Sequence, residues 1–158
     1  MSRVDDWRQV VSLRLTPVGK GVFARRPFRK GQAVGHMRGP IIADDDYDPS
    51  YCVDMGKLGV LEPKTPFRYL NHSCEPNCEL VEWEAEPGEE PEIWVHTLRS
   101  VRPNDQLTID YAWPADAAIR CKCGSASCRG WVVDASELKL LERRARAKKD
   151  KARKARQA

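Results

Sequence analysis

Short stretches of alternating apolar and polar residues dominate the first half of the chain. They lie at residues 10–15, 21–24 and 32–35. Glycines separate them, a pattern typical of short strands joined by tight turns. A polar loop at 44–50 precedes two further apolar stretches at 51–55 and 58–61, which we expect to form a hairpin around Gly56.

The second half continues this pattern up to about residue 111. We expect strands at 79–83, 93–98 and 106–111, with an acidic surface loop at 84–92 and a turn at 102–105. Apolar and polar side chains alternate at 93–98, as in a half-buried strand. Ten glycines and eleven prolines agree with a mostly β, loop-rich architecture.

The pattern changes at Asp134, where a helix is predicted to begin. Asp134 can cap the helix, and Glu137 lies three residues later, as in a capping box. Leu138 and Leu141 give the helix one apolar face. Beyond them the residues are mostly Ala, Lys and Arg, so we expect the helix to fray or become disordered toward Ala158.

Charge is distributed unevenly around a net value of +4. Residues 139–158 contain ten Lys and Arg against two Asp and Glu, so the rest of the chain is acidic. An acidic body attracts basic partners, whereas the tail favours phosphate-rich partners such as nucleic acid or only aids solubility. No apolar segment suits a membrane span or a signal peptide, so an intracellular, soluble protein is expected.

Three of the six cysteines form a close group. Cys121, Cys123 and Cys128 have the spacing C-x-C-x4-C, and three such thiolates complete a tetrahedral zinc site when a fourth ligand is supplied. Candidates for that ligand are Cys52, Cys74, Cys78 and the three histidines. The alternative is a set of buried thiols without metal.

Four motifs in order along the chain point to one family. Residues 68–78, with the sequence R-Y-L-N-H-S-C-E-P-N-C, resemble the signature R-F-x-N-H-S-C-x-P-N-C of SET-domain protein-lysine methyltransferases. Residues 105–111 are similar to the family's G-E-E-L-T-F-D-Y segment, and residues 19–24 to its opening G-x-G-V-F-A. Residues 121–131 resemble the post-SET segment that follows the domain in many members.

The resemblance implies a SET-domain fold, in which short sheets surround a knot-like crossing. It implies a SET domain at 10–114, a post-SET zinc-binding segment at 117–133 and a basic, partly helical or disordered tail at 134–158. The implied activity is methyl transfer from S-adenosyl-L-methionine to the ε-amine of a lysine in a basic protein such as a histone. The enzyme is then expected in the nucleus of a eukaryote or the cytoplasm of a bacterium.

The resemblance also assigns roles to individual residues. Tyr111 matches the catalytic tyrosine. Tyr51 and Ile109 fall near the substrate channel. Residues matching the cosubstrate contacts are Lys20, Gly21, Val22, Arg68, Asn71, His72 and Trp131, although Arg68 could instead brace its loop and Trp131 could be a hydrophobic plug. Cys74 is implied as the fourth ligand of a structural Zn²⁺, beside Cys121, Cys123 and Cys128.

Two positions depart from the family pattern. Met37 stands where a tyrosine close to the cosubstrate is common, which weakens the expected pocket wall. Ile109 stands where the family has Phe or Tyr, and it cannot donate a hydrogen bond to hold a water beside the amine. We therefore predict that the pocket accepts methylated lysine, which allows di- or trimethylation.

Two other kinds of function fit the same residues. One is a catalytically weak SET-fold module that binds a basic peptide. The other is a zinc protein that contacts nucleic acid through residues 139–156.

Overall fold

The structure is a computed structural model that describes residues 7–83 and 85–157. The segment considered for a signal peptide (residues 1–6), Glu84 of the predicted acidic loop and Ala158 at the end of the predicted tail lie outside the described residues. The chain divides into two units: unit 1 consists of Met1–Asn71 and Pro76–Ile109, and unit 2 of His72–Glu75 and Asp110–Ala158.

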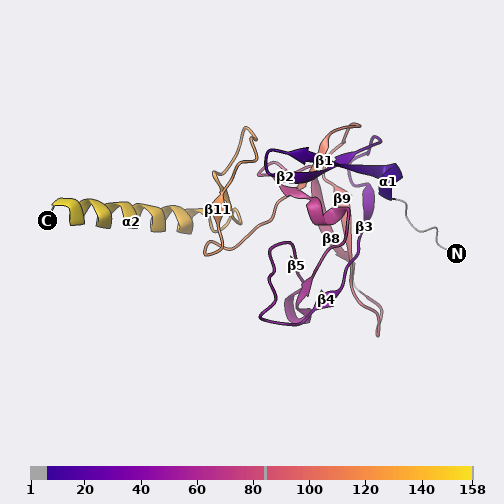
Figure 1. Cartoon of the computed structure of the whole chain (residues 1–158), viewed down its shortest axis with the longest axis horizontal. Helices are drawn as coiled ribbons and strands as arrows, with labels where there is room; N and C mark the ends of the chain where they lie inside the picture. The colour runs from indigo at the N-terminus through magenta and orange to yellow at the C-terminus, as the bar shows by residue number, and fades with distance from the viewer. Residues whose placement is uncertain (1–6, 84, 158) are drawn as a thin grey trace. The chain divides into compact units, whose positions relative to one another are not determined.

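Unit 1 is built almost entirely from short strands (Figure 1). They are β1 (Val11–Thr16), β2 (Gly19–Ala24), β3 (Ala33–Met37), β4 (Ile41–Ile42), β5 (Val53–Asp54), β6 (Val60–Leu61), β8 (Cys78–Trp83), β9 (Glu92–Thr97) and β10 (Gln106–Ile109), with β7 (Asn71–His72) where the two units meet in sequence. Three short helical turns complete the unit: α1 (Trp7–Val10), η1 (Gly56–Leu58) and η2 (Phe67–Tyr69). The expectation of a mostly β protein is confirmed.

The strands form three sheets in this part of the chain. Their orders are β1-β2-β10-β7, β3-β9-β8 and β4-β6-β5. β1 and β2 pair antiparallel over their whole length, and β8 pairs with β9 in the same way. β5 pairs with β6 around η1, which confirms the predicted hairpin at Gly56.

The core of unit 1 comes from inward-facing residues of these strands. Val11, Val22, Val95 and Leu107 have no exposed surface. Complete burial of such a side chain stabilises the fold by roughly 1.5–3 kcal/mol each. The predicted strand at 106–111 is two residues too long, because β10 ends at Ile109 and Asp110 is turned toward partners in unit 2.

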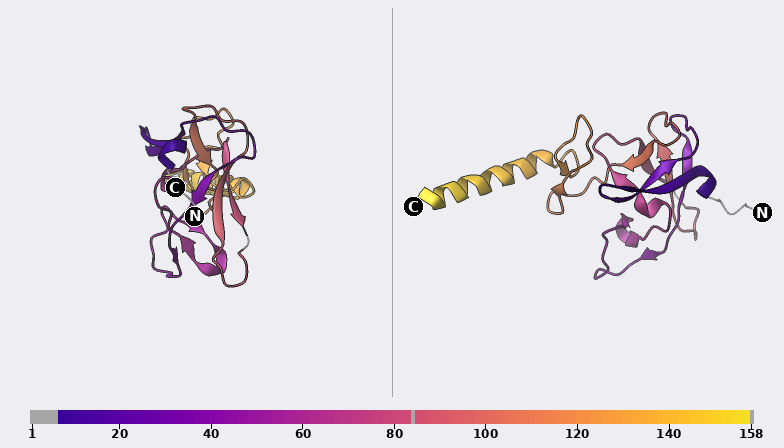
Figure 2. Two further views of the ribbon diagram at one scale, coloured as in Figure 1. Left: turned by 90° about the vertical axis from the view of Figure 1, so that its right-hand side faces the viewer. Right: turned by 45° about the horizontal axis from the view of Figure 1, so that its top comes forward.

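Unit 2 has little regular structure before its C-terminal helix. It contains a two-stranded sheet of β11 (Ile119–Arg120) and β12 (Trp131–Val132), then α2 (Leu138–Gln157), the long helix in the right view of Figure 2. Among the described residues of this unit, the buried apolar side chains are those of Ala115, Val132 and Val133. A core of this size is too small to fold a segment by itself.

The predicted start and cap of the C-terminal helix are wrong. α2 begins at Leu138, and the Asp134 carboxylate accepts hydrogen bonds from the backbone and side chain of Ser136 instead of capping a helix. The Glu137 carboxylate accepts a hydrogen bond from the Ala115 backbone N–H, so it does not complete a capping box. The helix also continues to Gln157, further than the predicted fraying allowed.

No helix in the described part of the chain is long and apolar enough to cross a membrane.

Candidate functional site

The glycine loop of β2 and Asn71 come together in unit 1. The Asn71 amide nitrogen donates a hydrogen bond to the Lys20 carbonyl oxygen at 3.1 Å. A Cβ atom on Gly21 would lie 2.7 Å from the Gln106 side chain and 3.2 Å from the Asn71 amide nitrogen. Glycine is therefore required for this close approach. Lys20, Gly21 and Asn71 of the predicted cosubstrate residues are therefore close together, and the fourth, Val22, is fully buried.

Arg68 lies in a polar network with the segment between β4 and β6. Its guanidinium donates to the Glu62 carboxylate at 2.8 Å and lies 4.5 Å from the centre of the Tyr51 ring. The Tyr47 hydroxyl donates a short hydrogen bond to the same carboxylate. Of the two roles considered for Arg68, these contacts favour bracing of its loop.

This network changes the acidity of two of its members. The hydrogen bonds from Tyr47 and Arg68 hold the pKa of the Glu62 carboxyl below its usual range. The bond to Glu62, with burial, raises the pKa of the Tyr47 phenol to about 12. At neutral pH the network is therefore a carboxylate held by a phenol and a guanidinium.

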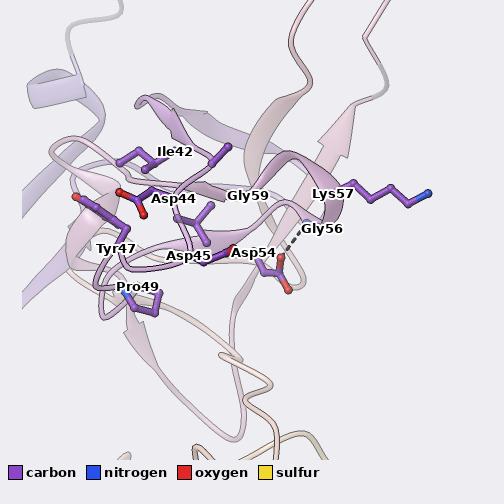
Figure 3. Close-up of a pocket in the computed structure, with 11 residues that line it drawn as sticks. Ile42, Asp44, Asp45, Tyr47, Pro49, Asp54, Gly56, Lys57 and Gly59 are labelled. Atoms are coloured by element: carbon purple, nitrogen blue, oxygen red, sulfur yellow. Dashed lines mark hydrogen bonds between the residues drawn. The ribbon is translucent and has the colours of Figure 1, made fainter.

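An acidic pocket is lined by residues between Ile42 and Val60 (Figure 3). Its volume is about 360 Å³, and the carboxylates of Asp44, Asp45 and Asp54 belong to its lining. Asp54 accepts a hydrogen bond from the Gly56 N–H at 2.8 Å, while Figure 3 shows the Lys57 side chain extending away from the pocket. The pocket is thus lined by negative charge.

The two positions that depart from the family pattern are both in the core of unit 1. Met37 ends β3 and is 2% exposed, and Ile109 ends β10 and is 8% exposed. Tyr51, by contrast, is 57% exposed. Of the two predicted channel residues, Tyr51 is therefore at the surface and Ile109 is buried.

His72 and Tyr111 are joined directly within unit 2. The Tyr111 backbone N–H donates to the Nδ1 atom of His72 at 3.1 Å, and the two rings lie 5.4 Å apart. The Tyr111 ring also lies 5.3 Å from that of Trp113. Burial lowers the pKa of the His72 imidazole, the Asp110 carboxylate opposes this shift and Arg129 adds to it.

Asp110 and Arg129 hold the segments on either side of the cysteine loop together. The Arg129 guanidinium donates to both carboxylate oxygens of Asp110 at 2.8 Å. Hydrogen bonding and the nearby carboxylate raise the pKa of Arg129 further, although burial opposes this. A half-buried bridge with two hydrogen bonds fixes geometry better than an exposed ion pair does.

Four cysteines converge in unit 2, and they are the four that the resemblance implied. The sulfur atoms of Cys74, Cys121, Cys123 and Cys128 all lie within 4.8 Å of one another. The sulfurs of Cys74 and Cys121 are 3.7 Å apart. Tetrahedral zinc with Zn–S bonds of about 2.3 Å requires sulfurs roughly 3.8 Å apart, so the set fits this ion.

The surroundings of the sulfurs act on their ionisation in both directions: hydrogen bonds favour the thiolates and burial opposes them. Backbone N–H groups of Cys123, Arg129 and Gly130 donate to the sulfurs of Cys121, Cys74 and Cys128, at 3.3–3.4 Å. Burial opposes ionisation of Cys123, but hydrogen bonds, including that from the Ser125 hydroxyl, lower the pKa of its thiol to about 6. Burial raises the pKa of Cys121 to about 12. Four thiolates so close together need a cation.

Gly124 shapes the turn of this cluster. Its φ is +72°, in the left-handed region that glycine adopts without a steric penalty. The turn brings Cys123 and Cys128 to one place, as the spacing predicted. The remaining cysteines, Cys52 and Cys78, lie outside the cluster, and burial raises the pKa of Cys78 to about 12.

Trp131 lies on β12 opposite Arg120 of β11. The Arg120 guanidinium is 3.9 Å from the centre of the Trp131 ring, a cation–π contact. One face of the indole is therefore covered within its own unit.

Comparison with known proteins places these motifs in a family. The family model described as the SET domain matches residues 19–112, which is more than half of the chain. The chain belongs to the SET-domain family. The match includes the glycine loop, the Asn71–His72 segment and Tyr111 of this SET domain.

Individual relatives agree with this assignment. The chain is 34% identical over 89 residues to histone-lysine N-methyltransferase SETD2 of Mus musculus, covering 55% of this chain and 3% of that protein. It is 30% identical over 133 residues to histone-lysine N-methyltransferase SETD1 of Drosophila melanogaster, covering 70% of this chain and 8% of the relative. The chain thus spans a small fraction of the length of these relatives.

A solved structure shows the same fold. The crystal structure of a histone methyltransferase candidate from Plasmodium falciparum matches with a TM-score of 0.56 and 19% sequence identity, over 65% of this chain and 92% of that one. At this identity the similarity supports the SET fold alone.

Two polar residues of this SET protein's candidate site were missed from sequence. Asp110 and Arg129 form a salt bridge in unit 2, yet in the sequence they are only the neighbours of Tyr111 and Cys128. The adjacent tyrosine and cysteine were the available signals. Neither neighbour indicates that the two side chains pair across 19 positions.

Proposed function

We propose that this SET domain transfers a methyl group from S-adenosyl-L-methionine to the ε-amine of a lysine in a basic protein segment, such as that of a histone. Family membership and the names of the relatives support the reaction class. The observation that carries the proposal is the hydrogen bond from the Tyr111 N–H to His72, because it joins the two motifs that the family places at its active site.

The chemistry requires a neutral amine. Free lysine has a pKa of about 10.4, and an apolar channel together with a nearby sulfonium lowers it by disfavouring the ammonium form. After the amine has lost its proton to water, no strong base is needed. Alignment of the amine, the methyl carbon and the sulfur then provides the remaining rate enhancement. In the proposal, the Tyr111 hydroxyl orients the amine.

The remaining site residues are proposed to hold the cosubstrate. The side-chain amide of Asn71 and the backbone of Lys20, Gly21 and Val22 receive its amino-acid end, and His72 contacts adenine through its backbone. Trp131 is proposed to pack on the adenine with the face that Arg120 leaves open. Arg68 is proposed to act indirectly, by bracing its loop through Glu62.

We propose Zn²⁺ as the ion of the four-cysteine cluster. Bound zinc supplies a closed tetrahedral cross-link without an open position for catalysis. Cys74 comes from the Asn-His-Ser-Cys motif and the other three thiolates from the post-SET segment, so the cluster ties that segment to the motif.

Replacement of the Tyr111 hydroxyl tests the catalytic role. We expect Tyr111→Phe to lower kcat on the order of 100-fold, since loss of alignment costs about this much. Tyr47→Phe is the matched control, because it removes a hydroxyl that bonds Glu62 outside the proposed centre, and it should keep nearly full activity. The measurement is transfer of radiolabelled methyl groups to a proteome extract, followed by peptide mapping.

Three outcomes distinguish methyl transfer from peptide binding without catalysis. Labelling that depends on Tyr111 supports methyl transfer. Wild-type labelling by Tyr111→Phe contradicts the role of the hydroxyl. Calorimetric binding of S-adenosyl-L-methionine by the native protein, with no labelled product, supports the alternative of a catalytically weak module that binds basic peptides.

The acidic pocket supports a basic substrate. Asp44, Asp45 and Asp54 line it, and Tyr51 is exposed on the neighbouring segment. A cluster of carboxylates raises the local concentration of a cationic peptide, mainly through its association rate. We therefore propose that peptide methylation weakens as salt is raised.

Helix α2 supports a second partner, nucleic acid. Its ten Lys and Arg residues are all exposed, and no ion pair is found among the described residues of the helix. A helix of 20 residues is about 30 Å long, and duplex DNA presents about 18 phosphates over that length. Between Glu142 and Gln157 the apolar residues are all alanine, which is too small to anchor a helix in a membrane.

The salt dependence of DNA affinity tests whether nucleic acid is this second partner. Anisotropy with a labelled duplex of arbitrary sequence should give a plot of log affinity against log salt with a slope of about −4 to −8. Lys148→Gln, Lys149→Gln and Lys151→Gln together should reduce the slope by about 2–3. Binding to anionic vesicles but not to DNA would contradict the proposal. In this view the enzyme works in the nucleus of a eukaryote or the cytoplasm of a bacterium.

A further inference from the structure

The imidazole of His72 is held at both of its nitrogens. Its side chain is only 5% exposed. Nδ1 accepts the hydrogen bond from the Tyr111 backbone N–H at 3.1 Å, and Nε2 lies 3.4 Å from the sulfur of Cys74. One ring therefore contacts both the segment that carries the proposed catalytic tyrosine and a member of the four-cysteine cluster.

The first of these bonds determines where the ring proton lies. A backbone N–H can only donate, so Nδ1 must present its lone pair to Tyr111. A neutral imidazole has one N–H, and it must then be on Nε2. That N–H faces the Cys74 sulfur, within the distance of a hydrogen bond to sulfur.

The neighbouring carboxylate does not compete for the ring proton. Asp110 Oδ1 lies 3.5 Å from Nδ1, but it already accepts hydrogen bonds from the Arg129 guanidinium and from the Ala112 backbone N–H. A proton on Nδ1 would point at the Tyr111 N–H, and two donors would then oppose each other. The geometry thus selects one tautomer.

The contacts close into a ring. The Cys74 sulfur receives Nε2–H of His72 and also the backbone N–H of Arg129 at 3.3 Å. Arg129 binds Asp110, and Asp110 is joined by a peptide bond to Tyr111, whose N–H returns to His72. Hydrogen-bond donors around a ligating thiolate stabilise its charge and fix its direction.

We propose that His72 is a positioning residue that connects the metal-ligating thiolate of Cys74 to the backbone of Tyr111. The proposal rests on the function proposed above, because it takes Tyr111 to be the catalytic tyrosine. It assigns the imidazole side chain of His72 a task separate from any cosubstrate contact: binding of the ion and placement of the tyrosine depend on the same ring.

Two substitutions separate the two bonds. His72→Gln can place its amide nitrogen near the position of Nε2, which keeps the donor to Cys74 and removes the acceptor for Tyr111. His72→Asn can place its amide oxygen near the position of Nδ1, which keeps the acceptor and removes the donor. His96→Gln and His96→Asn, on β9 in unit 1, are matched controls.

The two variants should fail in opposite ways. For His72→Gln we expect metal affinity within about threefold of the native value, but rapid hydrogen exchange at the Tyr111 amide and a kcat about tenfold lower with KM nearly unchanged. For His72→Asn we expect retained protection at Tyr111 and about tenfold weaker metal binding, measured by competition with a chelator and by the thiolate-to-metal absorption of the Co²⁺ protein. Equal effects of both variants on both readouts would overturn the proposal.

A measurement on the native protein guards against variants that do not fold. With ¹¹³Cd²⁺ in the cluster, an Nε2–H···S–Cd hydrogen bond should give a scalar coupling between the His72 ring proton and the metal. A ring protonated at Nδ1 would overturn the proposal. Metal affinity, amide exchange and this coupling can all be measured without methyl transfer. If the protein transfers no methyl group, the proposed function is wrong, but these three measurements still test the two hydrogen bonds of His72.

Discussion

Ile109 ends β10 with a side chain only 8% exposed, two residues before Tyr111. The SET families that it resembles have Phe or Tyr here. An aliphatic side chain fills less of the space beside the amine than an aromatic one, and it holds no water through a hydroxyl. We therefore expect this one residue to influence how many methyl groups the product carries.

Product analysis tests that consequence. We expect the native protein to form di- or trimethyl-lysine with excess S-adenosyl-L-methionine, and Ile109→Tyr to shift the product to monomethyl-lysine. Ile109→Val, which keeps the aliphatic character, serves as the control and costs about 0.5–1.5 kcal/mol of stability. Mass spectrometry that finds only monomethyl-lysine from the native protein would refute the interpretation.

At the scale of elements, the strands with four or more alternating residues were predictable, and the shortest were not. Apolar and polar side chains alternate along β1, and more and less buried side chains alternate along β9, as in a pleated, half-buried strand. β4 and β11 have two residues each, too few for any period. The capping box failed for a different reason: Glu137 found a backbone partner at Ala115, which lies 22 positions away.

The residues of the candidate site also divide into those that the sequence predicted and those that it did not. Motif spacing identified the four cysteines, His72 and Tyr111, because each belongs to a run of residues with recognisable chemistry. Asp110 and Arg129 gave no such signal, since their pairing depends on how the chain returns after the cysteine loop. The arrangement of the Glu62 carboxylate between Tyr47 and Arg68 was hidden for the same reason.

The Glu62 network gives a prediction for this segment in acid. Because the pKa of Glu62 is lowered in the folded protein, its contribution is fully present above the unfolded pKa of about 4.3 and is lost as the pH falls through the lower folded pKa. We expect Glu62→Gln to reduce Tm at pH 7 by only about 1–3 °C, since the site is partly exposed. The difference should begin to shrink near about pH 4 and should disappear only below the folded pKa of Glu62, which is lower. A Tm difference that stays constant from pH 7 to pH 3 would contradict this role.

At the scale of the whole molecule, the two units depend on different forces. Unit 1 has a core of fully buried aliphatic side chains, including Val11, Val22, Val95 and Leu107. Unit 2 buries few apolar side chains among its described residues and gathers four sulfurs instead. We therefore expect binding of the proposed ion to supply a large part of the folding free energy of unit 2.

Removal of the metal should therefore act on one unit. We expect a chelator to raise the rate of tryptic cleavage after Lys122 at least about tenfold, while the segment from β1 to β9 stays resistant. Cys121→Ser should be cleaved rapidly with or without chelator, and Cys52→Ser, outside the cluster, should behave like the native protein. Equal cleavage of both units after chelation would contradict a separate dependence on metal.

Unit 2 takes His72–Glu75, as well as residues 110–112, from within the sequence that the SET-domain family matches. A gene rearrangement that joined the post-SET segment to another protein would carry three of the four thiolates and leave Cys74 and His72 behind. A mutation that ended translation after residue 112 would leave Cys74 without the other three sulfurs, although His72 would keep its partner Tyr111. An exchanged segment would therefore have to supply three sulfurs that fit Cys74.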